Sequence, residues 1–234
     1  MIKAVFFDWF NTLARYRPAR EEIQSQALRE SGILAPPEKL TRSILVADRE
    51  WFDENAVSPI RKRSQEEQAR IYARYQKTLL TEAGIAPPET DTFTRIMKRV
   101  RELSRALEFA LFDDVLPALK TLKERNLTLG LLSNMDRDVA PLCQKLGLEP
   151  YLSFAVTSGE VGADKPEPPI FLAALERAGV EATQAIHVGD QYKIDVDGAR
   201  RVNIKPLLLD RNDLYPEVKD CPRIHSLSEV VEYV

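Results

Sequence analysis

The second half of the chain alternates short apolar runs with helical segments, and this alternation restricts the fold more than any other feature. Beyond Asp114, residues 117–125 have the pattern of a helix. Short apolar runs with the pattern of buried strands follow at residues 127–132, 154–157, 185–188 and 206–209. Residues 223–225 predict a last edge strand, followed by a short helix with Ser226 and Glu229 as its capping box. The alternation predicts an α/β fold with a parallel, doubly wound sheet.

A first strand at residues 5–7 precedes this pattern, and Asp8 follows it directly. Residues 15–105 then have apolar positions at helical spacing and no convincing strand. We therefore predict an α/β core made of residues 1–14 and 106–234, with an inserted all-helical domain at 15–105. An insert at the tip of the first strand would stand over the carboxyl edge of the sheet, where it could cover a ligand.

Composition excludes several classes of protein. The 234 residues are 44% hydrophobic, enough for a sizeable core, and 33 basic against 36 acidic residues give a net charge of −3. This balance provides no basic field for nucleic acid. No apolar run approaches the roughly 18 residues of a membrane span, and no signal-peptide pattern is present, so we expect a cytoplasmic protein without a membrane partner. Cys143 and Cys221 form no C-x-x-C pair, which argues against a disulfide framework or a zinc site.

Polar residues of a consistent chemical kind follow the predicted strands. They are Asp8 and Thr12, Ser133 and Asn134, Lys165 in the loop 162–166, and Asp190 with Asp195. Because the carboxyl ends of parallel strands share one edge of the sheet, these residues are candidates for a common site. A carboxylate can form a covalent intermediate, and hydroxyl and backbone N–H groups can hold phosphate oxygens. An ammonium adds positive charge, and converging carboxylates favour Mg²⁺.

These residues resemble the four ordered motifs of the haloacid dehalogenase-like (HAD) hydrolase superfamily. The motifs are Phe7-Asp8-x-x-x-Thr12, Leu132-Ser133-Asn134, Lys165-Pro166 and Val188-Gly189-Asp190-x-x-x-x-Asp195-x-x-Gly198-Ala199. The helical insert resembles the type 1 cap of subfamily I, and the resemblance covers essentially the whole chain. It implies a Rossmann-like core, a Mg²⁺ cofactor, a small phosphorylated substrate and a monomer or homodimer.

The resemblance also implies a role for each motif residue. The implied catalytic residues are Asp8, Thr12, Ser133 and Lys165, the substrate-binding residues Ser133, Asn134 and Lys165, and the metal ligands Asp8, the backbone carbonyl of Phe10, Asp190 and Asp195. Taken singly, each position also has an ordinary structural explanation. Asp and Ser side chains cap turns and helices, and a loop lysine can simply be solvated.

Phe10 departs from the pattern of the phosphatases that the chain resembles. They have an acid two residues after the nucleophile, which protonates the leaving alcohol and then activates water. Phenylalanine can do neither, and loss of general acid–base help costs about 10² to 10⁴ in rate. Halide leaves without a proton, so Phe10 is no obstacle to a dehalogenase, and the chain resembles the dehalogenases of the superfamily in having an aromatic residue at this position. Those enzymes, however, work without metal.

The retained pair Asp190 and Asp195 favours a Mg²⁺-dependent phosphatase with an aspartyl-phosphate intermediate on Asp8. A 2-haloacid dehalogenase with the same nucleophile is the second hypothesis, and a non-enzymatic phosphate-ligand or protein-binding module is the third. A phosphonate-cleaving relative also lacks the second acid, but it uses a cap lysine for which the insert has no recognisable motif.

His187 lies inside the apolar run 185–188, away from the predicted strand tips. A histidine in such a run is more often a hydrogen-bonded core residue than a catalyst. We therefore predict a structural role for His187.

Overall fold

The computed structural model describes residues 1–234, which separate into two compact units. The first unit contains Met1–Arg15 and Leu111–Val234, and the second contains Tyr16–Ala110. Each unit has its own buried core, so each is described separately below.

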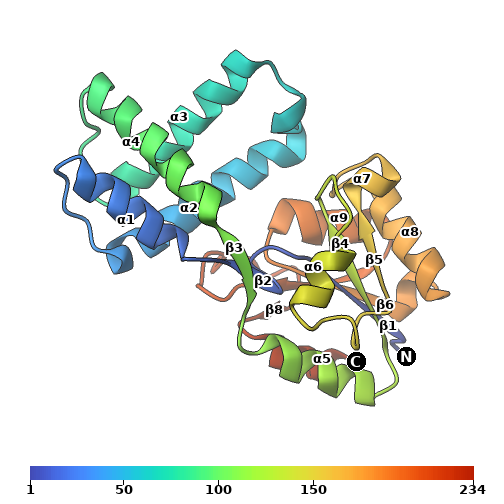
Figure 1. The fold of residues 1–234 in the computed structure, drawn as a ribbon. Helices are drawn as coiled ribbons and strands as arrows, with labels where there is room; N and C mark the ends of the chain where they lie inside the picture. Colours follow the sequence, from blue (N-terminus) through green and yellow to red (C-terminus); the bar gives the residue numbers. More distant parts are fainter. The chain divides into compact units, whose positions relative to one another are not determined.

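A six-stranded sheet forms the centre of the first unit, with strand order β5-β4-β1-β6-β7-β8 (Figure 1). The strands are β1 (Ala4–Phe7), β4 (Thr128–Ser133), β5 (Phe154–Thr157), β6 (Ala185–Gly189), β7 (Lys205–Leu209) and β8 (Arg223–Ile224). All the pairs are parallel, which confirms the predicted doubly wound α/β class. Every residue of β1 and β6 is buried, as expected for central parallel strands that are covered on both faces.

Helices cover both faces of this sheet. They are α5 (Val115–Glu124), α6 (Ala140–Lys145), α7 (Ser158–Val161), α8 (Pro168–Ala178), η3 (Ala182–Gln184), the π-helix η4 (Tyr192–Val196), α9 (Asp197–Arg201) and the 3₁₀ helix η5 (Leu227–Tyr233). Helix α5 packs with η5, and α8 packs with α9 on the opposite side of the sheet (Figure 1). The predicted capping box of Ser226 with Glu229 is present at the start of η5. Gly198 allows α9 to approach α8, because a Cβ there would lie 2.7 Å from the ring of Phe171.

The second unit is built from helices, with a small apolar core of its own. They are α1 (Arg20–Glu30), α2 (Pro37–Val57), η1 (Ile60–Lys62), α3 (Gln65–Glu82), α4 (Thr90–Leu103) and η2 (Ser104–Ala106). Leu28, Leu40 and Leu80 are fully buried members of this core. Gly32 and Gly84 follow α1 and α3 with φ of +83° and +67°, the left-handed backbone with which many helices end.

Two short strands, β2 (Ala14–Arg17) and β3 (Glu108–Leu111), pair in a separate sheet. The expectation of no strand in residues 15–105 is therefore wrong at its start. Within β2 only Ala14 is buried, so the segment lacks the alternating burial of an ordinary strand. Its partner comes from the other end of the helical insert, and the rings of Tyr16 and Phe109 stack with centroids 4.9 Å apart. A pairing between residues so distant in the chain leaves no local signal in the sequence.

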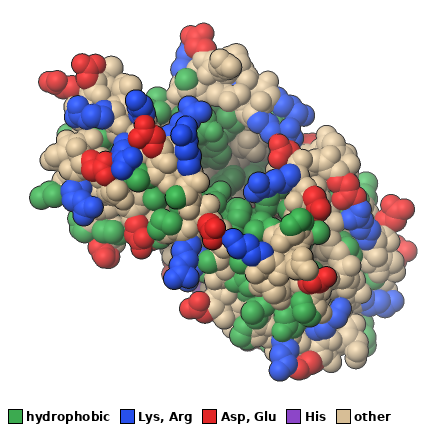
Figure 2. Space-filling model, viewed as in Figure 1, with side chains coloured by type: hydrophobic (Ala, Val, Ile, Leu, Met, Phe, Trp, Pro, Cys, Tyr) green, Lys and Arg blue, Asp and Glu red, His purple; other side chains and the backbone are tan.

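No helix of the chain combines the length and the apolar character needed to cross a membrane. Figure 2 shows Lys and Arg side chains interspersed with Asp and Glu over the visible face, in keeping with 33 basic and 36 acidic residues. That face therefore carries no extended surface of a single charge.

Leu131 and Leu172 provide a matched test of the packing. Leu131 is fully buried in β4, whereas Leu172 on α8 is 52% exposed. Leu131→Ala should lower the free energy of unfolding by about 2 to 5 kcal/mol, because the core loses apolar contacts and gains a cavity. Leu172→Ala should change it by no more than about 0.5 kcal/mol. Urea denaturation measures both, and equal losses would contradict the burial assigned to β4.

Candidate active site

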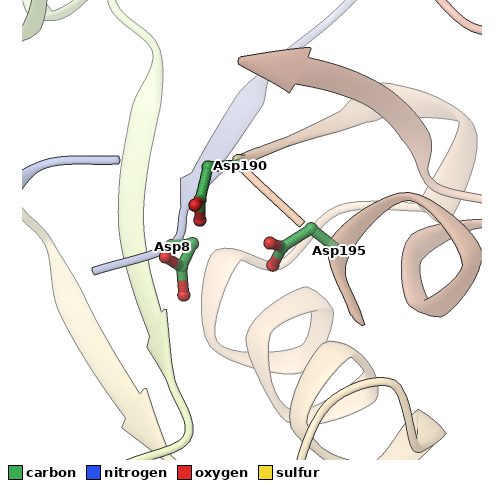
Figure 3. A group of neighbouring side chains, drawn as sticks. All are labelled: Asp8, Asp190 and Asp195. Atoms are coloured by element: carbon green, nitrogen blue, oxygen red, sulfur yellow. The ribbon is translucent and has the colours of Figure 1, made fainter. Parts of the chain in front are cut away.

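Three carboxylates lie close together at the carboxyl ends of the neighbouring strands β1 and β6 and on the helix that follows β6 (Figure 3). Asp8 follows β1, Asp190 follows β6, and Asp195 is carried by η4. Strands β1 and β6 are paired in parallel, and the backbone N–H of Asp8 donates to the carbonyl of Val188 at 2.9 Å. One oxygen from each carboxylate lies within 4.8 Å of the other two. The structure therefore brings together the side chains predicted to ligate a metal.

Gly189 allows Asp195 to fold back against the end of β6. A Cβ at residue 189 would lie 2.1 Å from the carboxyl carbon of Asp195, which no side chain could tolerate. The turn is closed by two hydrogen bonds: the N–H of Asp195 donates to the carbonyl of Gln191 at 2.7 Å, and the N–H of Gln191 donates to Asp195 Oδ2 at 3.1 Å. The spacing between Asp190 and Asp195 is thus that of one tight turn.

Lys165 places a buried ammonium among these carboxylates. Its side chain is 1% exposed, and Nζ lies 2.5 Å from Asp8 Oδ1 and 2.7 Å from Asp195 Oδ1. The solvated-loop explanation for this lysine is therefore excluded. Asn134 fixes the loop that carries Lys165, since its Oδ1 accepts from the backbone N–H of Lys165 at 2.7 Å and its Nδ2 donates to the carbonyl at 3.0 Å.

Ser133 and Asn134 stand at the carboxyl end of β4, beside β1. Ser133 is the last residue of the strand, is 3% exposed and pairs with Thr157 of β5. Both polar atoms of the Asn134 side chain are bonded to the main chain of Lys165. A direct substrate contact from Asn134 would therefore come from its backbone N–H rather than from its amide.

The loop after Asp8 folds tightly on itself. The N–H groups of Leu13 and Ala14 both donate to the carbonyl of Trp9, and Phe10 forms an isolated bridge with Ala14. Thr12 is fully buried, and its hydroxyl oxygen has no hydrogen-bond partner. Its carbonyl instead accepts from Arg211 Nη2 at 3.1 Å. The backbone of this loop is thus held by Arg211, a link that the sequence pattern did not indicate.

His187 is buried on β6, and its Nε2 lies 2.9 Å from Asp195 Oδ1. The prediction of a hydrogen-bonded core histidine is confirmed, but its partner is one of the three clustered carboxylates. An ionised carboxylate only accepts hydrogen bonds, so Nε2 carries the proton. Burial lowers the pKa of His187, which keeps the ring neutral. The sequence indicated only that His187 and Gly189 share a face of the strand, because they are two residues apart. The packing of Asp195 on Gly189, which brings its carboxylate to that face, comes from the structure.

The three acids of the cluster have pKa values shifted in different directions by burial and by neighbouring charges. Burial raises the pKa of Asp8 from 3.8 to about 6, with the Lys165 ammonium opposing the shift and the Asp195 charge adding to it. Burial, together with the charges of Asp8 and Asp195, raises the pKa of Asp190 well above its usual range. Burial also acts to raise the pKa of Asp195, but Lys165 and His187 outweigh it and the net pKa is lowered. The pKa of Lys165 rises because both carboxylates outweigh its burial.

The donor set fits a hard divalent cation. The cluster contains three carboxylates and no sulfur ligand, and the single ammonium of Lys165 does not neutralise the three carboxylates when all are ionised. Ligand oxygens on opposite sides of a Mg²⁺ ion are about 4.2 Å apart. In this cluster one carboxylate oxygen of each residue lies within 4.8 Å of the other two, which is a similar separation. A bound Mg²⁺ would offset the raised pKa values of Asp8 and Asp190.

Comparison with known proteins defines the class of this fold and site. Residues 2–203 match the family of haloacid dehalogenase-like hydrolases, and the chain belongs to that family. It is 38% identical over 121 residues to haloacid dehalogenase-like hydrolase domain-containing protein 3 of Danio rerio, covering 52% of this chain and 50% of that protein. The matched region thus spans about half the length of that curated relative.

Two further relatives match over nearly their whole length. The chain is 28% identical over 229 residues to a glyceraldehyde 3-phosphate phosphatase of Methanopyrus kandleri, covering 94% of this chain and 90% of that protein. It also resembles the crystal structure of a 2-haloacid dehalogenase from Pseudomonas syringae, with a TM-score of 0.57 and 27% identity over 99% of this chain and 97% of that one. The family thus includes relatives with both of the chemistries considered from the sequence.

The raised pKa of Asp8 predicts a pH-dependent stability in metal-free protein. The folded state holds the Asp8 proton more tightly than the unfolded chain, so this contribution is present below the unfolded pKa of about 3.9 and is lost as the pH rises through about 6. Asp8→Asn removes the titration. Relative to this variant, the wild type should lose roughly 1 to 3 kcal/mol between about pH 4 and pH 7.

Thermal or urea unfolding in EDTA at several pH values measures this difference. Asp113→Asn is the matched control for the loss of one carboxylate, because the Asp113 side chain is 99% exposed. Added Mg²⁺ should restore the wild type near neutral pH. A gap between wild type and Asp8→Asn that stays constant with pH would contradict the assignment.

Proposed function

We propose that the chain is a Mg²⁺-dependent phosphatase that acts on a small phosphorylated metabolite through an aspartyl-phosphate formed on Asp8. The observation that carries the proposal is the convergence of Asp8, Asp190 and Asp195 around the buried ammonium of Lys165. Three carboxylates with one ammonium match a divalent cation and, with it, the anionic phosphoryl group of a substrate. The full-length similarity to a phosphatase of Methanopyrus kandleri supports this class of reaction.

In the proposed reaction, a carboxylate oxygen of Asp8 attacks phosphorus, and the bond between phosphorus and the leaving oxygen breaks. Water then attacks the aspartyl-phosphate, which releases inorganic phosphate and restores Asp8. Lys165 holds Asp8 in place and places a positive charge beside the phosphoryl oxygens, while Ser133 and the backbone N–H of Asn134 bind those oxygens. Mg²⁺, when bound by Asp8, Asp190, Asp195 and the carbonyl of Phe10, supplies further positive charge against the phosphoryl group.

Phe10 defines which substrates suit this site. A leaving oxygen with a high pKa needs a proton as its bond breaks, and the Phe10 side chain has none to give. Esters and anhydrides whose leaving group departs as a stable anion do not need that proton. We therefore propose that aryl, acyl or similarly activated phosphates are turned over faster than simple alkyl phosphates.

A 2-haloacid dehalogenase is the second candidate, because Phe10 and the structural similarity to the Pseudomonas syringae enzyme both favour it. In that reaction Asp8 attacks carbon, halide leaves without a proton, and water hydrolyses the resulting ester. The cluster of Asp190 and Asp195 beside Asp8 weighs against it, since a metal-free reaction has no use for the extra negative charge. A non-enzymatic binding module ranks third, because burying Lys165 between two carboxylates is costly for a site without chemistry.

Metal removal separates the two enzymatic candidates. Release of phosphate from p-nitrophenyl phosphate should require Mg²⁺ and stop with EDTA, and Asp8→Asn should abolish it because the nucleophile is lost. Asp113→Asn, an exposed carboxylate outside the cluster, should retain the activity. Halide release from a 2-haloacid that persists in EDTA would instead establish the dehalogenase, and turnover by Asp8→Asn would exclude both.

Restoring an acid at residue 10 tests the missing proton donor. Phe10→Asp should raise turnover of alkyl phosphates, by up to the factor of about 10² to 10⁴ that general acid–base catalysis contributes. Phe10→Asn is the matched control. Asparagine also removes the ring and is close to aspartate in size and polarity, but it has no acidic proton to donate. The gain should be smaller on p-nitrophenyl phosphate, whose leaving group needs no proton. Equal rates for the two variants on alkyl phosphates would contradict the role given to this position.

A further inference from the structure

Gln191 contacts two of the three clustered carboxylates. It follows Asp190 directly and is 8% exposed. Its Nε2 donates to Asp190 Oδ2 at 2.6 Å, and its backbone N–H donates to Asp195 Oδ2 at 3.1 Å. The reaction proposed above uses neither contact, and none of the four sequence motifs includes residue 191 as a defined position.

Tyr215 sets the orientation of the Gln191 amide. The Tyr215 hydroxyl donates to Gln191 Oε1 at 3.3 Å. Because only the oxygen of an amide accepts, this hydrogen bond turns the NH₂ group toward Asp190. Asp190 is therefore reached by a chain of two hydrogen bonds that begins at Tyr215, in the segment that follows β7.

Tyr215 is itself firmly held. Asp210 accepts hydrogen bonds from the backbone N–H groups of Leu214 at 2.7 Å and Tyr215 at 2.9 Å, and from Arg223 at 2.9 Å. The Tyr215 side chain is 2% exposed and packs in a cluster with Val196 and Leu208. A hydroxyl fixed in this way can determine where its acceptor lies, which a mobile surface tyrosine could not do.

We propose that Gln191 and Tyr215 are positioning residues for the Mg²⁺ site, and that they act by fixing the carboxylate of Asp190. The Gln191 amide donates to Oδ2 of Asp190 and so restricts rotation of the carboxylate. The other oxygen, Oδ1, is thereby held in one position for the metal. A residue that hydrogen-bonds to a metal ligand orients that ligand and raises the affinity of the site for the metal. Direct contact of the Gln191 side chain with substrate is excluded by its burial and by the use of both amide ends. The inference rests on the proposed function, because it requires a cation at the carboxylate cluster.

Magnesium affinity tests the inference without relying on activity. Mg²⁺ is titrated by calorimetry into the full chain and into Gln191→Met, which keeps an unbranched side chain of similar length but no hydrogen bond. Association should weaken by about 10- to 100-fold. Tyr215→Phe removes only the hydroxyl, and should weaken association in the same direction but less. In a steady-state assay, kcat at saturating Mg²⁺ should recover in both variants while the Mg²⁺ concentration for half-maximal rate rises.

Two matched controls come from the helical unit. Gln76→Met replaces another buried glutamine, which is 4% exposed, and Tyr75→Phe removes a hydroxyl that donates to the buried carboxylate of Asp48 at 2.9 Å. Both should keep wild-type affinity for Mg²⁺ even if they lower stability. Should Gln191→Met fail to fold, Tyr215→Phe and its control carry the same comparison.

The outcomes separate this inference from the proposed function. Weaker Mg²⁺ binding in the Gln191 and Tyr215 variants, with unchanged controls, supports both. Wild-type affinity in Gln191→Met or, where that variant does not fold, in Tyr215→Phe overturns the positioning role and leaves the Mg²⁺ site in place. Absence of Mg²⁺ binding by the wild type overturns the proposed function, and the inference with it.

Discussion

The buried ammonium of Lys165 is the interaction on which the candidate site depends. A charge that is 1% exposed costs several kcal/mol to remove from water unless it is paired, and here two carboxylates, Asp8 and Asp195, pair with it. Asp8 directly follows β1, Asp195 lies in η4 after β6, and Lys165 lies in the loop between α7 and α8, so the pairing exists only when these segments are brought together by the assembled sheet. The side chain of Asn134 then fixes this loop through two hydrogen bonds to the backbone of Lys165. The same interactions thus stabilise this edge of the sheet and set the geometry of the site.

The remaining carboxylate creates a deficit of positive charge that a ligand can fill. Lys165 pairs with Asp8 and Asp195 but not with Asp190. Burial, with the charges of the neighbouring carboxylates, raises the pKa of Asp8 and of Asp190. A site in this condition gains stability when a divalent cation binds, since binding favours the ionised acids. Phe10 does not alter this electrostatic arrangement. What its side chain lacks is a proton to give, so binding of a phosphoryl group and proton transfer to the leaving group are separable properties in this protein.

Alternation of apolar runs and helical segments was sufficient to predict the class of the sheet, because each buried parallel strand is a local, nearly continuous apolar run. Strand β5 was predicted at its observed bounds, and β1 and β6 to within one residue. The same reasoning missed β2, whose residues form a strand only because β3 returns from the far end of the insert. It also treated His187 as a core residue without finding its hydrogen bond to Asp195.

The sequence by itself determined which residues stand at the carboxyl ends of the strands, since that follows from local apolar patterns and from the order of the motifs. Tertiary structure decided what those residues contact: Lys165 between two acids, Arg211 on the loop after Asp8, and Tyr215 behind Gln191. Such hydrogen bonds join segments that are distant in the chain, and they depend on strand register and loop conformation to a fraction of an ångström. Local propensity carries no information at that precision, because the same residues at the same spacing are compatible with many loop conformations.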